Sequence, residues 1–168
     1  YLIVRFESGR ALLIHLRMTG SLRHARRGTL AGDPHTRAVL SLDNELDVAY
    51  RDVRRFGTWE VLEPGELGPY LARRLGPEPL GPDFDGEYLF EAARGRKLAA
   101  RDFLMNTRVL AGVGNIYANE CLFLAGIRPQ RAAGRITRVR YIRLAEAIRQ
   151  TLEKAIRAGG TTLRDFQN

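Results

Sequence analysis

The sequence has a single cysteine, Cys121, which excludes an internal disulfide and a zinc site built from several cysteines within this chain. Acidic residues are fewer than basic ones, 19 against 27, and every basic residue except Lys97 and Lys154 is arginine. No apolar run reaches membrane-spanning length and no signal peptide is visible, which favours a cytoplasmic protein. The net charge of +8 favours a polyanionic partner such as nucleic acid, although a solvated basic surface is the alternative.

The 168 residues fall into two parts with different residue patterns. Residues 1–63 contain short β-branched, leucine-rich and aromatic segments separated by turn residues, which predicts part of an antiparallel β-sandwich. Residues 64–168 have helical apolar spacing, so the fold class is α+β, with a helical domain after the sandwich portion. The expected strands are YLIVRF, ALLIHLR, RAVLSL, ELDVAY and GTWEVL.

The second half predicts three helices after a Pro- and Gly-rich connector. One covers residues 98–110, and the next covers 115–125 and places Cys121 in the core. The third begins after Thr137 as N-cap and ends at Gly159 and Gly160. Its expected buried face consists of Tyr141, Ala145, Ile148, Leu152 and Ile156.

The stretch LAGVGNIYANE opens the second of these helices. Gly112 and Gly114 permit a tight turn and a close approach to the backbone. Asn115 falls where a helix needs an N-cap, so the N–H groups of Ile116 and Tyr117 would point outward and form an anion site. Taken alone, the pattern is also typical of an ordinary Asn-capped turn.

Four arginines lie around the connector that follows, Arg128, Arg131, Arg135 and Arg138. Together with the helix starts they could converge on one track of phosphates. Two helices joined by a glycine turn, followed by this connector and a third helix, predict a helix-two-turn-helix module.

Five blocks of the sequence form a pattern that extends over essentially the whole chain. They are HLRMTGSLR (15–23), RDVRRFGTW (51–59), LGPEPL (75–80), FLMNTRVLAGVGNIYANECLFLAGIRP (103–129) and AGGTTLRDF near the end. With these blocks, which occur in the family's order, the sequence resembles the formamidopyrimidine-DNA glycosylase family, bacterial enzymes that excise oxidised purines such as 8-oxoguanine.

The resemblance implies that three residues extrude the damaged base and contact the base opposite. Met18 would fill the void left by the flipped nucleotide, Arg54 would meet the cytosine opposite the lesion, and Phe56 would wedge into the stack. From the residues alone, Met18 is interpreted as a side chain that fills space in the core, and Arg54 as one that stacks on a half-buried Phe56. If the segment is extended, Arg54 and Phe56 lie on the same side. Arg55 is the expected ion-pair partner of Asp52.

The resemblance also implies a set of phosphate contacts. His15 and Asn115 would hold phosphates beside the lesion, with Gly114 supplying close backbone and Tyr117 supporting the contact. Arg101 stands where the family usually has lysine. Taken alone, His15 is more typical of a structural histidine near the core whose hydrogen bonds are made within the protein.

Parts of the family pattern are absent from the sequence. The attacking N-terminal proline, the glutamate after it and a basic lysine before the first strand are not found, nor is the C-terminal zinc finger. We therefore expect a central fragment that has no catalytic residue, metal or cofactor of its own. The intact parent would be a monomeric glycosylase and AP lyase with zinc in its finger, acting on double-stranded DNA that contains oxidised purines, with no membrane partner.

Three alternatives stay open from the sequence. One is an endonuclease VIII type glycosylase for oxidised pyrimidines, and another is a non-catalytic nucleic-acid-binding helix-two-turn-helix module. A basic sandwich protein with no nucleic-acid partner is the third. The combination of RRFG with Met18 favours the purine glycosylase, because a structural RNA binder needs no wedge.

Overall fold

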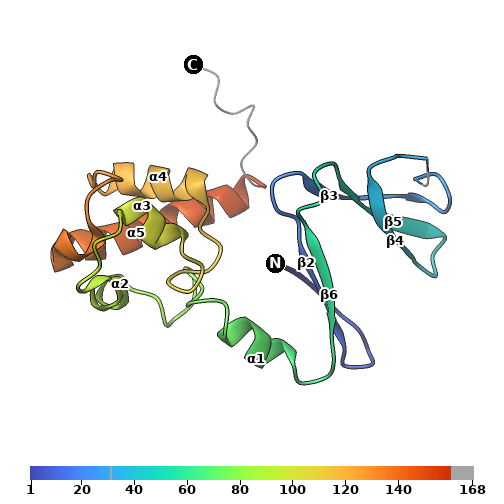
Figure 1. Cartoon of the computed structure of the whole chain (residues 1–168), viewed down its shortest axis with the longest axis horizontal. Coiled ribbons are helices and arrows are strands. Elements are labelled where there is room, and N and C mark those ends of the chain that lie inside the picture. Colours follow the sequence, from blue (N-terminus) through green and yellow to red (C-terminus); the bar gives the residue numbers. More distant parts are fainter. Residues whose placement is uncertain (31, 160–168) are drawn as a thin grey trace, which may run out of the picture. The chain divides into compact units, whose positions relative to one another are not determined.

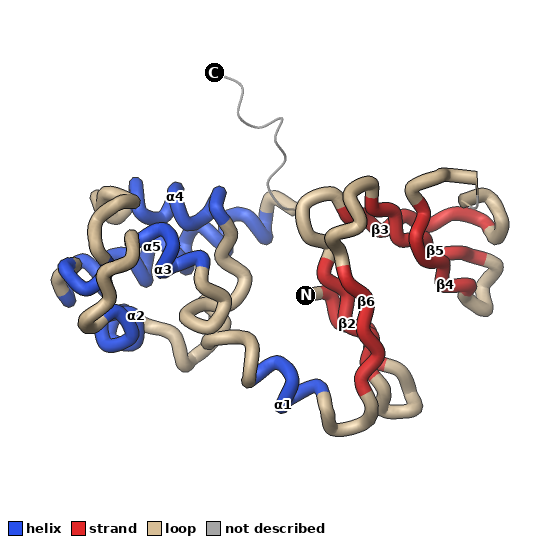
Figure 2. The backbone as a smooth tube through the Cα atoms, viewed as in Figure 1, coloured by secondary structure: helices blue, strands red, loops and turns tan. Residues whose placement is uncertain are grey.

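The computed structural model describes residues 1–30 and 32–159 (Figure 1). Contacts divide the chain into two compact units, Tyr1–Pro69 and a second unit that begins at Tyr70. The first holds the strands and the second nearly all of the helices (Figure 2). This confirms the α+β class. The boundary expected after residue 63 precedes helix α1, and the contacts divide the chain inside that helix.

The first unit contains two three-stranded antiparallel sheets, with orders β1-β2-β6 and β3-β5-β4. The strands are β1 (Leu2–Arg5), β2 (Ala11–His15), β3 (Gly20–Arg26), β4 (Thr36–Ser41), β5 (Leu46–Asp52) and β6 (Thr58–Leu62). Ala11 to Ile14 are buried, because β2 is the central strand of its sheet.

Strand β3 is absent from the sequence prediction. Its residues, GSLRHAR, are polar at most positions and none is fully buried. It pairs with β5 along its whole length, from Gly20 opposite Asp52 to Arg26 opposite Leu46. Backbone pairing with an apolar neighbour therefore defines this strand. Its own sequence has no alternation of apolar and polar residues that would predict it.

The helices are α1 (Leu67–Ala72), α2 (Gly86–Ala93), α3 (Ala100–Met105), α4 (Asn115–Leu124) and α5 (Arg138–Arg157), with a 3₁₀ turn at Ala133–Arg135. Asp85 caps α2, since its Oδ1 accepts a hydrogen bond of 2.7 Å from the Tyr88 N–H. No described helix combines the length and apolarity required to cross a bilayer.

The helix expected over residues 98–110 is much shorter in the structure. Helix α3 covers Ala100–Met105, and Asn106 ends it in an extended conformation. The Asn106 carbonyl then accepts hydrogen bonds from the N–H groups of Val109, at 2.8 Å, and Leu110, at 3.1 Å. A turn thus buries these two apolar residues, which helical periodicity alone assigns to the helix.

The third expected helix begins where it was predicted to begin, but its buried face differs from the prediction. Thr137 is the N-cap of α5, and Gly159, with φ +75°, follows the C-cap. Tyr141, Ala145 and Ile148 are buried, whereas Ile156 is 67 % exposed. Gly160 and most of the AGGTTLRDF block lie outside the described residues.

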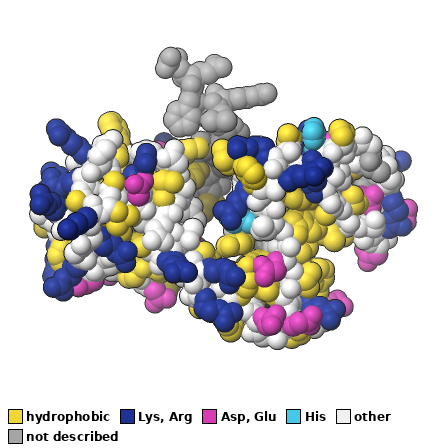
Figure 3. All heavy atoms as spheres, viewed as in Figure 1, with side chains coloured by type: hydrophobic (Ala, Val, Ile, Leu, Met, Phe, Trp, Pro, Cys, Tyr) yellow, Lys and Arg dark blue, Asp and Glu magenta, His cyan; other side chains and the backbone are white. Residues whose placement is uncertain are grey.

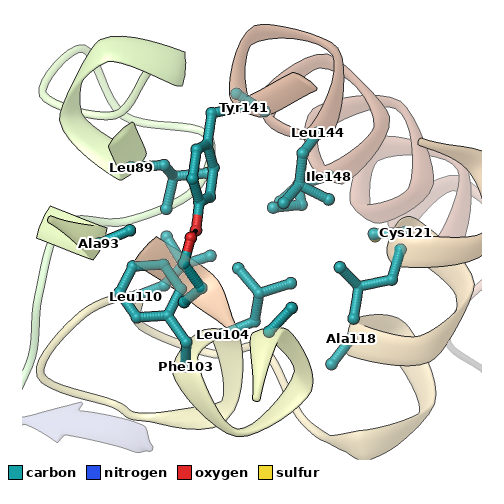
Figure 4. Close-up of a cluster of buried hydrophobic side chains, with 14 of the residues drawn as sticks. Leu89, Ala93, Phe103, Leu104, Leu110, Ala118, Cys121, Tyr141, Leu144 and Ile148 are labelled. Carbon is teal, nitrogen blue, oxygen red and sulfur yellow. Dashed lines mark hydrogen bonds between the residues drawn. The ribbon is translucent and has the colours of Figure 1, made fainter. Parts of the chain in front are cut away.

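The core of the helical unit forms around Tyr141 (Figure 4). Its ring lies edge-on to Phe103, with 6.2 Å between centroids, and its hydroxyl donates to the Ala133 carbonyl at 3.0 Å. Burial raises the pKa of this hydroxyl. Cys121 is fully buried in the same cluster, as expected.

Candidate nucleic-acid interface

Two loops of the β unit bring three of the expected DNA-reading residues together. Met18, 77 % exposed, lies in the loop from β2 to β3, and Phe56, 51 % exposed, lies in the loop from β5 to β6. Arg54 joins them: its Nη1 is 3.7 Å from the Met18 sulfur, and its guanidinium carbon is 4.5 Å from the Phe56 ring centroid. We call Met18, Arg54 and Phe56 the wedge cluster.

The backbone reaches this arrangement through a turn. Arg55 has φ +56°, in the left-handed region, so the segment from Arg54 to Phe56 is not extended. The condition under which the sequence places Arg54 and Phe56 on one side, an extended segment, is therefore not met. The guanidinium stacks on the aromatic ring, which is half-buried, as in the alternative that the sequence left open.

A fully buried carboxylate, Asp52, holds both loops. It lies at the end of β5 and accepts hydrogen bonds from both sides of the cluster. Its donors are Thr19 Oγ1 at 2.5 Å, Tyr50 OH at 3.0 Å, Arg54 N at 3.2 Å and Gly57 N at 2.9 Å. These hydrogen bonds, led by that from Thr19, hold the pKa of the carboxyl well below its ordinary value.

The expected ion pair between Arg55 and Asp52 is wrong. No ion pair in the described part of the chain joins them, because Asp52 is satisfied by two hydroxyls and two backbone N–H groups. The sequence offered one signal for this role, an aspartate directly between a strand and a turn.

Gly57 is the point where the second loop returns to β6. A Cβ added there would overlap the Tyr50 hydroxyl and come within 2.8 Å of the His15 carbonyl oxygen. The Tyr50 hydroxyl is itself bound to Asp52. Only glycine therefore allows the loop to close over this hydrogen-bonded group.

His15 ends β2 at the base of the Met18 loop. Its Nδ1 accepts a hydrogen bond of 3.1 Å from the Arg17 N–H, and its ring meets Tyr1 edge-on, with 5.0 Å between centroids. Burial, with the charge of Arg17 second, lowers the pKa of the imidazole. The ring is therefore neutral near pH 7, and with Nδ1 as acceptor its proton lies on Nε2, where it can donate to a phosphate.

The start of α4 differs from the expected cap. Gly114, with φ −96° and ψ −175°, is the N-cap, and its carbonyl accepts from Ala118 N at 2.9 Å. Asn115 is therefore the first helical residue, and the expectation that it caps the helix is wrong. Its Oδ1 accepts from Asn119 Nδ2 at 3.1 Å. Gly114 and Asn115 are exposed and Tyr117 is half-buried, so an anion can reach the positive end of the helix.

Two of the expected phosphate ligands have acidic partners. Arg101 in α3 donates to Asp102 Oδ1 at 3.1 and 3.0 Å, and Arg138 pairs with Glu87 at 3.4 Å. Arg101 would therefore have to exchange its partner to bind a phosphate. Arg131 donates to the Arg135 carbonyl, and the convergence of the connector arginines with the start of α4 stays a prediction.

Within residues 1–30 and 32–159, no group of three or more His, Cys, Asp or Glu residues is placed to hold a metal ion. Cys121, the one cysteine of the chain, is buried, and burial raises the pKa of its thiol. A buried thiol with a raised pKa is not a reactive nucleophile.

Comparison with known proteins extends over almost all of the chain. Residues 1–59 match the formamidopyrimidine-DNA glycosylase N-terminal domain, and residues 75–167 match the H2TH domain of the same family. The chain is 54 % identical to a formamidopyrimidine-DNA glycosylase of Halorhodospira halophila over 166 residues, with 99 % of this chain and 61 % of the relative covered. The enzyme of the same name from Ectopseudomonas mendocina is 51 % identical, with 99 % and 60 % covered.

Solved structures give the same result. A Lactococcus lactis formamidopyrimidine-DNA glycosylase bound to DNA containing an AP site matches with a TM-score of 0.90 at 33 % identity, covering 96 % of this chain and 62 % of that one. The same bacterium's protein in complex with FAPY-dG DNA also scores 0.90 at 33 % identity, with 97 % and 61 % covered. The chain thus spans about 60 % of the length of the relatives that it matches. It belongs to the formamidopyrimidine-DNA glycosylase family.

Proposed function

We propose that the protein containing this chain is a base-excision repair enzyme that binds damaged duplex DNA, flips out oxidised purines such as 8-oxoguanine and formamidopyrimidine, and excises them. It would then nick the abasic site by β,δ-elimination. The observation that carries this proposal is the wedge cluster, an exposed thioether, guanidinium and aromatic ring gathered on two loops. Its curated relatives are DNA glycosylases by name.

The chemistry of the wedge cluster suits an opened base pair. Met18 and Phe56 expose apolar side chains to water, and insertion into a base stack removes that surface from solvent. The Arg54 guanidinium donates hydrogen bonds but accepts none, so it can pair with the acceptors of the base left without its partner. The apolar side chains of Met18 and Phe56, with the Arg54 guanidinium between them, therefore suit the space that a single flipped nucleotide leaves in the base stack.

The remaining expected site residues would hold phosphates beside the lesion. His15 supplies a neutral N–H donor, and Gly114, Asn115 and Tyr117 form the positive start of α4. Arg101 would add a cation after it releases Asp102. Such contacts fix the register of the duplex and leave the choice of base to the wedge cluster.

The attack on the sugar requires an amine that this sequence does not provide in the family's manner. We propose that the parent supplies an N-terminal proline and that a zinc finger, also outside this sequence, completes the DNA contact. We further propose that the parent acts as a monomer in the bacterial cytoplasm, where its DNA substrate is found.

These proposals predict binding without cleavage for the 168-residue chain. We expect it to bind a duplex with a tetrahydrofuran abasic-site analogue about tenfold more tightly than an undamaged duplex, because the lesion lowers the cost of opening the stack. An 8-oxoguanine duplex should stay intact during prolonged incubation. Fluorescence anisotropy and a gel cleavage assay measure the two. Equal affinity for both duplexes would contradict the proposed lesion recognition, and cleavage above a protein-free blank would contradict the absence of an attacking amine.

Asn115→Ala tests the phosphate contact at α4. We expect weaker binding of damaged and undamaged duplexes alike, by about 1 to 3 kcal/mol, because phosphate contacts do not discriminate between bases. The control is Gln150→Ala, which removes an exposed amide from α5. A loss restricted to the damaged duplex would assign Asn115 to lesion recognition instead.

A further inference from the structure

A pocket of about 660 Å³ lies in the helical unit, between the loop after α2 and the segment around the 3₁₀ turn. Its charged lining residues are Arg96, Lys97, Arg131 and Arg135, and no acidic residue lines it. Lys and Arg side chains are prominent at the end of this unit where α5 begins (Figure 3). The pocket is thus a concave surface with charge of one sign.

The backbone of the pocket is held in place by hydrogen bonds between its two walls. The Gly134 N–H donates to the Arg96 carbonyl at 2.9 Å, and Ala99 and Ala132 form an antiparallel bridge. A Cβ on Gly134 would come within 2.9 Å of the Arg96 carbonyl oxygen. The close approach of the walls fixes the backbone positions from which their cationic side chains extend.

Two of the guanidinium groups are also oriented by the chain itself. Arg131 donates from Nε and Nη2 to the Arg135 carbonyl, at 3.1 and 2.9 Å, and Arg96 donates from Nε to the Ala92 carbonyl at 2.7 Å. A guanidinium has five N–H donors, so both groups keep donors for a ligand. Less side-chain freedom is then lost when that ligand binds.

Neighbouring arginines show a different pattern of pairing. Arg94 pairs with Glu91 at 3.1 Å, and Arg138 pairs with Glu87 at 3.4 Å. In the described part of the chain, none of the ion pairs includes a cation that lines the pocket. The four like charges repel one another, and an anion between them removes that cost.

We infer that this pocket is a phosphate-binding site, and that its ligand is the sugar-phosphate backbone of the duplex at a place separate from the start of α4. No residue of α4, which begins at Asn115, lines the pocket, so the two candidate phosphate sites share no residue. Four cations match adjacent phosphates of one strand better than a single monoanion. The inference rests on the proposed DNA binding, and a free diphosphate is the other source of the same chemistry.

The test compares the full chain with Arg96→Gln/Lys97→Gln and with the control Arg140→Gln/Arg143→Gln. The control removes the same charge from exposed positions on α5 outside the pocket. Anisotropy titrations with an undamaged 30-base-pair duplex at several salt concentrations give the slope of log K against log [salt]. We expect the pocket variant to lower the magnitude of that slope by about 2 and the control to change it by less than about 0.5. Thermal melting verifies that each variant is folded.

A second titration separates this inference from the proposed function. Inorganic pyrophosphate is titrated into the chain and both variants by calorimetry. If the wild-type chain binds no duplex, the proposed DNA binding fails, and pyrophosphate binding that only the pocket variant loses would support a phosphate pocket for free diphosphate. Equal slope changes in both variants, together with no pyrophosphate binding lost in the pocket variant, would overturn the inference.

Discussion

Asp52→Asn is expected to lower the melting temperature by roughly 10 °C and to reduce the preference for abasic-site DNA about tenfold. The carboxylate accepts two hydroxyl and two backbone donors in a fully buried position. An amide presents one oxygen and one NH₂ group, so some of these donors would face another donor. Because Thr19 and Arg54 stand on different loops, the wedge cluster would lose its common support. Thermal melting and anisotropy with tetrahydrofuran and undamaged duplexes measure the two effects.

Asp47→Asn is the matched control for this substitution. Asp47 lies on the same strand and is also buried, but its carboxylate holds Gly28 N at 2.8 Å and Ser41 Oγ at 2.7 Å, away from the wedge loops. We expect this variant to lose stability while it keeps its lesion preference. If both variants lose the preference equally, Asp52 acts only through general stability.

The acidity of Asp52 gives the first prediction a pH dependence. Its pKa in the folded chain lies below the ordinary value, chiefly because of the hydrogen bond from Thr19. The unfolded state therefore binds the proton first, and the stabilisation is present above about pH 4 and is lost as the pH falls below it. The difference in melting temperature between wild type and Asp52→Asn should be largest near neutral pH and should shrink towards pH 2. A difference that does not change with pH would argue against an ionised Asp52.

Phe56→Ala is expected to weaken binding of abasic-site DNA by about 1 to 3 kcal/mol, while affinity for undamaged duplex changes little. The ring supplies a flat apolar face that the methyl group of alanine cannot replace, and its removal also frees the Arg54 guanidinium from its stacking partner. The measurement is the ratio of the two dissociation constants, with 2-aminopurine fluorescence beside the lesion as a probe of wedge insertion.

Phe6→Ala controls for the loss of an exposed aromatic ring. Phe6 follows β1 and is 43 % exposed, close to the 51 % of Phe56. We expect it to leave both dissociation constants unchanged. Equal losses of affinity for damaged and undamaged duplexes in Phe56→Ala would place the ring among nonspecific contacts and remove it from the wedge.

The residues of the wedge cluster could be predicted from the sequence only through the resemblance, and the sequence offers one signal for their support, the position of Asp52 between a strand and a turn. Local patterns find helix α4 and most strands because apolar residues recur at the period of each element. They extend α3 too far, since the turn at Asn106 keeps Val109 and Leu110 buried without continuing the helix. The burial of Asp52 depends on two loops about 35 positions apart, which no single-sequence period records.

The basic pocket could not be predicted from local sequence patterns either, because its two walls are also far apart in the sequence. Its walls come from residues 95–97 and 131–135, and their approach depends on Gly134 fitting against the Arg96 backbone. The sequence shows the arginines of the connector but not which of them have acidic partners. Arg138 pairs with Glu87 and would have to exchange this partner to bind a phosphate, and the pairing follows from tertiary packing of α2 against α5.

The topology of the β unit limits how the two wedge loops can vary in length. Along the described strands, the chain passes from one sheet to the other only between β2 and β3 and between β5 and β6, and each passage carries part of the wedge cluster. Surface loops ordinarily accept insertions, because nothing beyond their own ends depends on their length. Here an added residue in either passage would shift Met18 or Phe56 relative to Asp52, which holds both passages by hydrogen bonds. The segment between β3 and β4 joins strands of one sheet and carries no residue of the wedge cluster, so these two passages alone are constrained by it.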